Sequence, residues 1–274
     1  MSWHGWTVEP ALAYVVLAAV LYAIGGRGYR RAAEQSRWRA VSFAAGLATI
    51  VIALDSPLDG YADSLFWAHM SQHVLLLTVA PPLVLLGRPW PRMWRAIPSA
   101  VRVAVGRALS RSPWTAPIRA LARPIPAWIL FNVTILAWHL PSAYNATLTS
   151  GAVHDAEHAM FFFTGLLFWA RVIDPGPLRP RLNWLTRTGY VIGAMVVGWG
   201  LAITLVLVPD PIYSHYALLA HRPGGFSALT DQQLAAGIMW VPGSLSYGIA
   251  MFLTFYRWLE PATPSRSHQP ALTI

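Results

Sequence analysis

Seven long apolar stretches, separated by loops that alternate in charge, constrain this chain more than any other feature of its sequence. All 20 basic residues are arginines, and all but Arg222 fall in alternate loops. The chain is 55% apolar and only 11% charged, whereas a soluble domain carries about 25% charged residues. A membrane span needs about 20 mostly apolar residues. The sequence therefore predicts an all-α integral membrane protein.

The apolar stretches predict seven transmembrane helices. Their approximate ranges are residues 9–26, 38–54, 65–87, 124–140, 153–173, 188–208 and 234–256. Because arginine-rich loops stay on the cytoplasmic side, we expect the N-terminus outside and the C-terminus inside. We expect one seven-helix domain over residues 1–260 and a disordered cytoplasmic tail over residues 261–274. No basic residue precedes the first apolar stretch, so we expect that stretch to be retained rather than cleaved as a signal peptide.

The longest arginine-rich loop contains an amphipathic segment near residues 98–111, in which Val101 and Val105 face away from Arg102 and Arg107. Such a segment is typical of an interfacial helix, so we expect it to lie on the cytoplasmic leaflet and contact anionic lipid. The formal charge of +9 indicates membrane topology rather than nucleic-acid binding, because the arginines lie in loops between apolar spans.

Two proline sites are expected to bend helices. Pro81-Pro82 in the third helix and Pro242-Gly243 in the seventh remove backbone donors and predict kinks.

Two residue types are missing altogether. The chain has no cysteine, which excludes disulfides, thiolate metal sites, iron–sulfur clusters and cysteine nucleophiles. It also has no lysine, which excludes a Schiff base to retinal or pyridoxal phosphate and a P-loop.

Histidines gather at the predicted outer side of the helices. His69 and His73 begin the third helix, and His154 and His158 begin the fifth, each pair spaced four residues apart. Residues four apart share a helix face, so each pair points its imidazoles the same way. His139 ends the fourth helix at the same level. Since intramembrane ionisable groups are costly to bury, we predict one metal site formed by these five residues. The alternative is five independent, hydrogen-bonded core histidines.

Further residues at this depth could add ligands or orient the imidazoles. They are Met70, Glu157, Asp155, Asp63 and Met239. Ligating histidines usually donate their second N–H to a carboxylate or carbonyl, which is the expected role of the acids. Alternatively, Asp155 and Asp231 cap the fifth and seventh helices, and Met239 contributes only to packing.

Three other functions are alternatives to a metal site that binds an ion without catalysing a reaction. Residues 154–158 match H-x-x-E-H, in which two histidines bind zinc and the glutamate activates water in a hydrolase. A membrane cytochrome would hold haem iron between histidines of two helices. A transporter would need polar residues throughout the spans, but the inner halves of the predicted helices are almost wholly apolar.

With these residues the chain resembles the CtaG family of multi-span bacterial cytochrome c oxidase assembly factors. The resemblance runs from about residue 55 to residue 256. The segments that carry it are Asp55-Ser56-Pro57-Leu58-Asp59, His69-Met70-Ser71-Gln72-His73, Ala80-Pro81-Pro82-Leu83, Trp138-His139-Leu140-Pro141 with Tyr144, His154 with Glu157-His158, Asp231-Gln232-Gln233-Leu234 and Met239-Trp240.

The resemblance implies a seven-helix protein of the bacterial plasma membrane that helps to build the oxidase and is not itself an enzyme. It also implies that the bound metal is copper, since the spacing of the histidines alone indicates only an imidazole site. The implied partners are cytochrome c oxidase subunits and a periplasmic copper chaperone. Without cysteine, this chain could not pass copper through its own thiolates.

Overall fold

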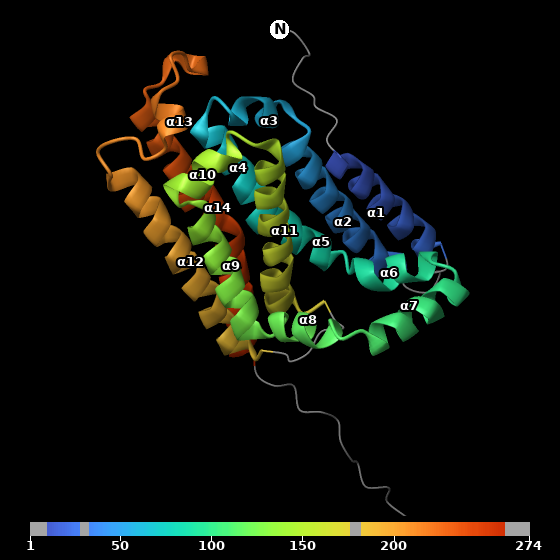
Figure 1. The fold of residues 1–274 in the computed structure, drawn as a ribbon. Coiled ribbons are helices and arrows are strands. Elements are labelled where there is room, and N and C mark those ends of the chain that lie inside the picture. The colour runs from blue at the N-terminus through green and yellow to red at the C-terminus, as the bar shows by residue number, and fades with distance from the viewer. Residues whose placement is uncertain (1–9, 28–32, 176–181, 261–274) are drawn as a thin grey trace, which may run out of the picture.

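The computed structural model describes residues 10–27, 33–175 and 182–260, and these residues form helices and loops without a β-strand (Figure 1). The all-α prediction is therefore confirmed for the described residues, and the predicted tail at 261–274 lies outside them. The helices are α1 Pro10–Gly26, α2 Ala33–Leu54, α3 Pro57–Ala62, α4 Phe66–Val74, η1 Leu75–Val79, α5 Ala80–Leu86, α6 Pro89–Ala96, α7 Ser99–Arg111, α8 Thr115–Leu121, α9 Pro124–Trp138, α10 Pro141–Thr147, α11 Gly151–Ile173, α12 Trp184–Leu207, α13 Ser214–Ala217, η2 Pro223–Gly225 and α14 Ala228–Leu259.

Five helices of the described chain are long and apolar enough to cross a membrane. They are Arg37–Ala62, Phe66–Leu86, Gly151–Ile173, Trp184–Leu207 and Ala228–Leu259. The pair α8 and α9, bent by 74°, would make a sixth span, and Ala11–Gly26 is a shorter apolar helix. Each of the seven predicted apolar stretches thus coincides with a helix, while the count of seven spans remains a prediction.

The long helices form a bundle with short helices at its two ends (Figure 1). In that view α3 and α13 lie at the upper end, and α7 and α8 cross the lower end. The segment α4–η1–α5 runs through the interior: α4 packs against α14 and α3, and α5 packs against α2 and α11. Helix α9 packs against α11 and α12. The predicted amphipathic segment forms the helix α7.

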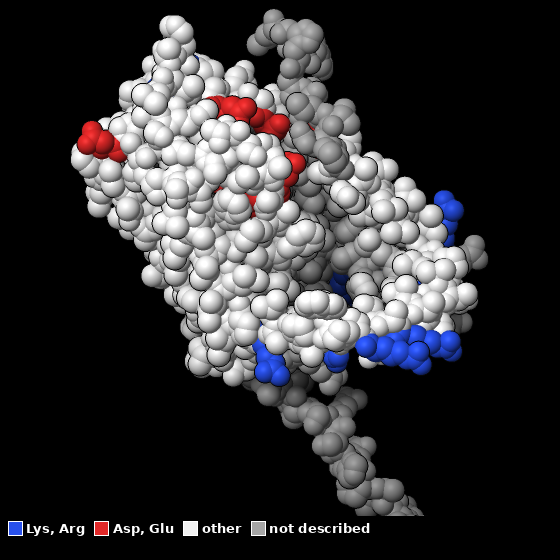
Figure 2. Space-filling view, viewed as in Figure 1, with Lys and Arg blue, Asp and Glu red and all other residues white. Residues whose placement is uncertain are grey.

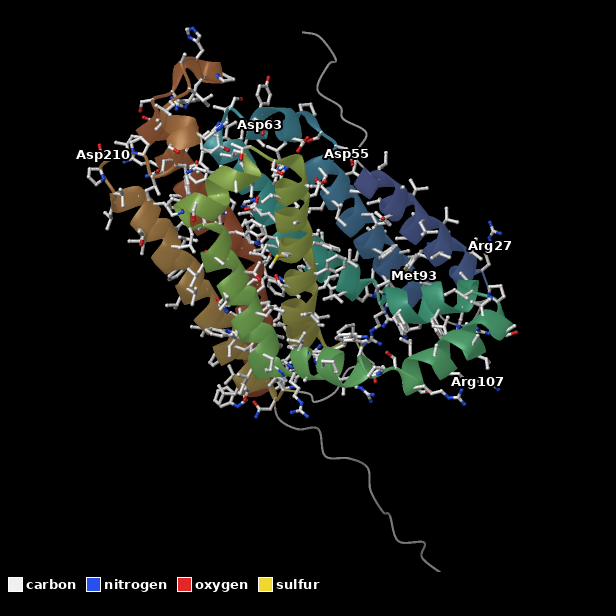
Figure 3. All side chains as sticks on the ribbon, in the orientation of Figure 1. Arg27, Asp55, Asp63, Met93, Arg107 and Asp210 are labelled. Atoms are coloured by element: carbon white, nitrogen blue, oxygen red, sulfur yellow. The ribbon has the colours of Figure 1, made fainter. Side chains whose placement is uncertain are left out.

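The surface of the bundle is apolar between two differently charged ends. Large apolar side chains are exposed along α12 and α14, including Leu207 and Phe252, as expected for a surface that faces lipid. Figure 2 shows acidic side chains at the upper end and arginines along the lower end. Figure 3 places Asp63 and Asp210 at the upper end and Arg107 at the lower one.

The interior helix is interrupted where the sequence places two prolines. Residues Leu75–Val79 form a π-helical turn, and Pro81 and Pro82 lie in the first turn of the α-helix that follows. A proline removes a backbone N–H and frees the carbonyl four residues earlier. For Pro81 that carbonyl belongs to Leu77, and it accepts a hydrogen bond from the indole N–H of Trp169 at 3.0 Å. A side chain of the neighbouring helix α11 therefore supplies the hydrogen bond that the Leu77 carbonyl lacks within its own helix.

At the second proline site, α14 continues through Pro242 as one helix from Ala228 to Leu259, and the kink expected there stays a prediction. The side chain that caps this helix is Ser227, whose hydroxyl accepts the N–H of Thr230. The alternative prediction that Asp231 caps its own helix is therefore wrong. Asp155 does not cap α11 either, since that helix begins at Gly151.

Two apolar clusters divide the bundle along its length. One contains Phe161, Phe168 and Trp169 of α11 with residues of α9, α12 and α14. The other gathers aromatic residues near the upper end, including Tyr144 and Tyr216. The predicted histidine layer lies between these two clusters, since His73 contacts Phe161 at a ring distance of 4.4 Å and His69 contacts Tyr144 at 5.1 Å.

Candidate metal centre

The first helix of the site is α4, which carries His69 and His73 one turn apart. Its N-terminus is fixed from outside the helix, because the carboxylate of Asp231 accepts the backbone N–H groups of Phe66 and Trp67 at 2.9 and 3.0 Å. Gln72 also anchors α4, because its amide donates to the carbonyl of Ala53 at 2.7 Å. These contacts set the rotation of α4, and both imidazoles face α11.

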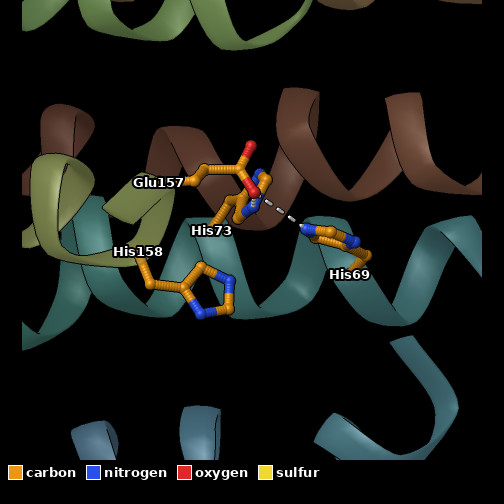
Figure 4. A group of neighbouring side chains, drawn as sticks. All are labelled: His69, His73, Glu157 and His158. Atoms are coloured by element: carbon orange, nitrogen blue, oxygen red, sulfur yellow. Dashed lines mark hydrogen bonds and ion pairs between the residues drawn. The ribbon is translucent and has the colours of Figure 1, made fainter. Parts of the chain in front are cut away.

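The second helix is α11, which contributes Glu157 and His158. Glu157 Oε2 lies 3.3 Å from His69 Nε2 and 3.4 Å from His73 Nε2, so one carboxylate oxygen contacts both imidazoles of the facing helix (Figure 4). His69 and Glu157 have no exposed surface, and His73 and His158 are buried. A carboxylate in such a place needs cationic or hydrogen-bonding neighbours, because an isolated buried charge is very costly.

These four residues form a compact donor set. One ligand atom from each of His69, His73, Glu157 and His158 can be chosen so that all four atoms lie within 4.8 Å of one another. Three imidazole nitrogens and one carboxylate oxygen suit copper, zinc, iron or nickel. The four donors come from two helices, α4 and α11 (Figure 4).

His69 is held in an orientation that suits metal binding. The hydroxyl of Tyr216 donates to the carbonyl of Ala62 at 2.5 Å and lies 3.3 Å from His69 Nδ1. Because that hydroxyl has already given its only proton, His69 Nδ1–H is the donor to Tyr216. In the neutral form of His69 the lone pair is then on Nε2, which lies 3.3 Å from Glu157 Oε2, and this nitrogen could bind a cation in an arrangement common around metal-ligating histidines.

Several buried atoms around this centre lack hydrogen-bond partners among the described residues. They are His73 Nδ1 and Nε2, His139 Nε2, His154 Nε2, His158 Nε2 and Glu157 Oε1. Buried side-chain polar atoms are nearly always paired, so a group of orphaned atoms in one place calls for a physical explanation. A bound cation would satisfy several of these lone pairs at once.

The other two predicted histidines flank the four-residue group without joining it. His139 Nδ1–H donates to the carbonyl of Ile135 at 2.8 Å, which leaves Nε2 as the nitrogen with a lone pair. Its ring lies 6.1 Å from that of His73. The His154 ring lies 4.1 Å from that of His158. The structure thus brings all five predicted imidazoles into one layer, with three of them in the donor set.

Of the remaining predicted site residues, one belongs to the donor set and four do not. Glu157 lies in the donor set, whereas Met70 is fully buried in the upper apolar cluster and Met239 packs against that cluster. Asp155 and Asp63 are exposed at the upper end, and neither belongs to the donor set.

Three tyrosines that were not among the predicted site residues form a wall of the site. The rings of Tyr144 of α10, Tyr213 and Tyr216 make edge-on or tilted contacts with one another, with Phe66 and with His69. Burial raises the pKa of all three hydroxyls above the ordinary value, so they remain protonated at physiological pH. In the sequence, Tyr144 accompanies the Trp138-His139-Leu140-Pro141 segment that carries part of the family resemblance, and Tyr213 and Tyr216 flank His215.

The H-x-x-E-H pattern adopts a geometry different from that of a zinc hydrolase. In that pattern His154 and His158 would share the metal, and Glu157 would stand beside it to activate water. Here Glu157 lies between His69 and His73, and His154 lies outside the donor set.

The comparison with protein families gives one match over most of the chain. Residues 20–261 match the family described as cytochrome c oxidase caa3 assembly factor (Caa3_CtaG). The matched range includes all five predicted ligand histidines and Glu157.

Mycobacterial proteins are similar to this chain over much of its length. It is 27% identical over 233 residues to uncharacterized proteins of Mycobacterium bovis (Mb0105) and Mycobacterium tuberculosis (MT0111), which covers 82% of this chain and 35% of each relative. It is 24% identical over 257 residues to ML1998 of Mycobacterium leprae, covering 90% of this chain and 38% of the relative. The chain therefore spans little more than a third of the length of these proteins. No solved structure matches it.

Proposed function

This chain belongs to the family of cytochrome c oxidase caa3 assembly factors, and from that membership we propose that it helps to build the oxidase by holding copper. The copper would lie between His69, His73, Glu157 and His158, with His139 and His154 beside it. In this role the protein is an assembly factor that binds and delivers the ion, and it catalyses no reaction.

The observation that carries the proposal is the group of buried imidazole and carboxylate atoms without hydrogen-bond partners among the described residues. Three of the residues concerned, His73, Glu157 and His158, join His69 in the group whose ligand atoms lie within 4.8 Å of one another. A folded core retains such a group at considerable cost unless a cation compensates for it. Structural histidines would instead each be expected to show their own hydrogen-bond partner.

Copper is preferred to other metals because of the family. Three nitrogens and one oxygen would also suit zinc, but the oxidase that this family assembles carries copper in its metal centres. The proposal invokes no thioether ligand, since Met70 is buried in the upper apolar cluster and Met239 packs against it.

For the membrane arrangement we propose seven spans with the N-terminus outside. The five long helices, the bent pair α8–α9 and the shorter α1 would supply them. In this arrangement the arginine-rich lower end faces the cytoplasm of a bacterium, α7 lies on anionic lipid of the plasma membrane, and the metal centre lies near the periplasm.

The proposed partners follow from the location of the site. An ion held near the outer ends of α4 and α11 is within reach of a periplasmic copper chaperone, which would supply it, and of the oxidase subunits that would receive it.

Metal analysis of the purified protein tests the proposal. Wild-type protein loaded with copper and washed should retain the metal, and the double variant His73→Ala/His158→Ala should lose it. His221→Ala is the control, because His221 is an exposed histidine outside the donor set. Wild-type protein that holds no copper after loading would overturn the proposal. If the protein retained zinc in preference to copper, the site would be a zinc site. If it showed the absorption band of bound haem, the cofactor would be haem.

Single-cysteine labelling tests the topology. The chain has no cysteine of its own, so only the introduced thiol can react. Thr149→Cys and Ser110→Cys place a thiol at exposed positions near the upper and lower ends. A membrane-impermeant maleimide applied to intact cells or spheroplasts should label the first variant only. Equal labelling of both variants would refute the proposed orientation.

A further inference from the structure

His154 differs from the other histidines of the site in its exposure. His69, His73, His139 and His158 are all buried, whereas His154 is only partly so. It lies in the first turn of α11, one turn nearer to the upper end than His158.

His154 is nevertheless in direct contact with the donor set. Its ring lies 4.1 Å from that of His158 and 5.0 Å from that of His69. Its Nε2 atom is shielded from solvent and has no hydrogen-bond partner among the described residues. The side chain therefore holds a buried, unpartnered nitrogen beside the donor set, while the residue as a whole is partly exposed.

The surface beside His154 is negatively charged. The carboxylates of Asp59 and Asp63, on and just after α3, are close enough to act electrostatically on the His154 imidazole. Asp59 is held in place by the amide of Gln72, which donates to its Oδ1 at 2.8 Å. Figure 2 shows acidic side chains gathered at this end of the molecule, where Figure 3 labels Asp63.

The opposite side of the centre is closed. Phe161 contacts His73 at a ring distance of 4.4 Å, and below it Phe168 and Trp169 are fully buried in the lower apolar cluster. A cation would have to lose its hydration among apolar side chains to pass that way, at high cost. The upper end beside His154 is the route on which carboxylates and an imidazole can replace the hydration water stepwise.

We propose that His154 is the exchange ligand of this centre: copper ions from the outer aqueous phase pass the carboxylates of Asp59 and Asp63, bind His154 transiently, and move to His69, His73, Glu157 and His158. The ion leaves by the same route, toward an acceptor in the same aqueous phase. The proposal rests on the proposed copper function, and it assigns to His154 a role in the rate of transfer rather than in the capacity of the site.

Exchange kinetics of the purified, copper-loaded protein test this role. We expect His154→Ala and His154→Gln to bind the same number of copper ions as the wild type. Release to an excess of a hydrophilic copper chelator should become slower by about tenfold or more, the order of effect seen when a group beside a metal ligand is removed. His221→Ala, which alters an exposed histidine outside the donor set, should exchange copper at the wild-type rate.

The acidic residues are tested by the rate of loading. Asp59→Asn/Asp63→Asn keeps the side-chain shapes and removes two charges, so loading with copper at low ionic strength should slow by about tenfold. The difference should largely disappear in 1 M salt, where the screening length falls to about 3 Å.

The outcomes separate this inference from the function on which it rests. Wild-type protein that binds no copper contradicts the copper function itself. Wild-type protein that binds copper, with His154 variants that exchange it at the wild-type rate, refutes the exchange role. His154 variants that no longer hold copper would show a resident ligand and would also overturn the inference.

Discussion

The carboxylate of Asp231 in α14 accepts the backbone N–H of Phe66 at 2.9 Å, across 165 residues of sequence. Its second oxygen accepts the N–H of Trp67 at 3.0 Å. The first N–H groups of a helix have no partner within the helix, and a carboxylate there also interacts favourably with the helix dipole. Asp231 therefore fixes where α4 begins, and with it the position of His69 in the first turns of that helix.

Replacing Asp231 should destabilise the protein and weaken the metal site together. Asp231→Ala leaves two buried N–H groups without an acceptor and removes the partner of Arg222, whose Nε lies 3.8 Å from the carboxylate. We expect a loss of about 1–3 kcal/mol in the free energy of unfolding, measured by thermal or denaturant unfolding in detergent. Asp231→Asn keeps one oxygen acceptor, so its free energy of unfolding should decrease by less than that of Asp231→Ala. Equal stability of Asp231→Ala and wild type would show that another group caps α4.

Removing one hydroxyl should weaken metal binding without disturbing the fold. Tyr216→Phe eliminates the acceptor for His69 Nδ1–H and the donor to the Ala62 carbonyl. Since such orienting groups affect metal affinity by about 10–100-fold, we expect a reduction of that order. Competition with a chelator of known affinity measures it. Tyr61→Phe, at a tyrosine that is 47% exposed, is the control, and an equal effect in both variants would contradict the role of Tyr216.

Glu157 distinguishes a metal ligand from a catalytic base. In Glu157→Gln the side chain keeps its size but loses the charge that lies 3.3 Å from His69 and 3.4 Å from His73. If Glu157 is a ligand, copper affinity should fall by about tenfold or more, as measured by chelator competition. Full retention of metal, with loss of a hydrolytic activity present in the wild type, would favour the hydrolase interpretation instead.

The indole of Trp169 stabilises the proline-containing segment and should have no direct effect on metal binding. Trp169→Phe keeps most of the packing but leaves the carbonyl of Leu77 without its donor. An unsatisfied buried carbonyl costs about 1–3 kcal/mol, so the variant should unfold at a lower temperature and bind the same number of copper ions. A wild-type melting temperature would mean that water or backbone rearrangement replaces the indole.

Glycine at position 46 allows α2 to approach α5 closely. A Cβ there would lie 2.7 Å from Val84 Cγ2 and 2.9 Å from the backbone nitrogen of Val84. Gly46→Ala should therefore separate the helices and cost about 1–3 kcal/mol in the free energy of unfolding. Gly200→Ala is the control, because a Cβ there meets no heavy atom within 4 Å. Similar melting temperatures for both variants would contradict the close approach.

Much of the site could be predicted because its pattern is local. The four-residue spacing of His69 and His73, and of His154 and His158, guarantees that each pair shares a helix face. The lengths of the apolar stretches placed both pairs and His139 at one depth, and the structure brings all five rings together.

The placement of the carboxylates could not be obtained in the same way. Glu157 and Asp155 are near neighbours in sequence and chemically similar, yet one is fully buried between two histidines and the other is exposed. The rotation of α11 against α4 decides which acid faces inward, and that rotation depends on contacts between distant segments. The cap of α4 by Asp231 likewise depended on where α14 packs.

The sequence by itself determined that this chain forms apolar helices with arginines gathered at one end and imidazoles at one level, because helix periodicity and hydropathy are properties of consecutive residues. Only the tertiary structure decided that Glu157 joins three of the five histidines in one donor set, that His154 stays at its edge, and that Tyr216 orients His69. Those relationships arise where helices far apart in the chain pack together, and packing depends on the fit of whole surfaces rather than on any local pattern.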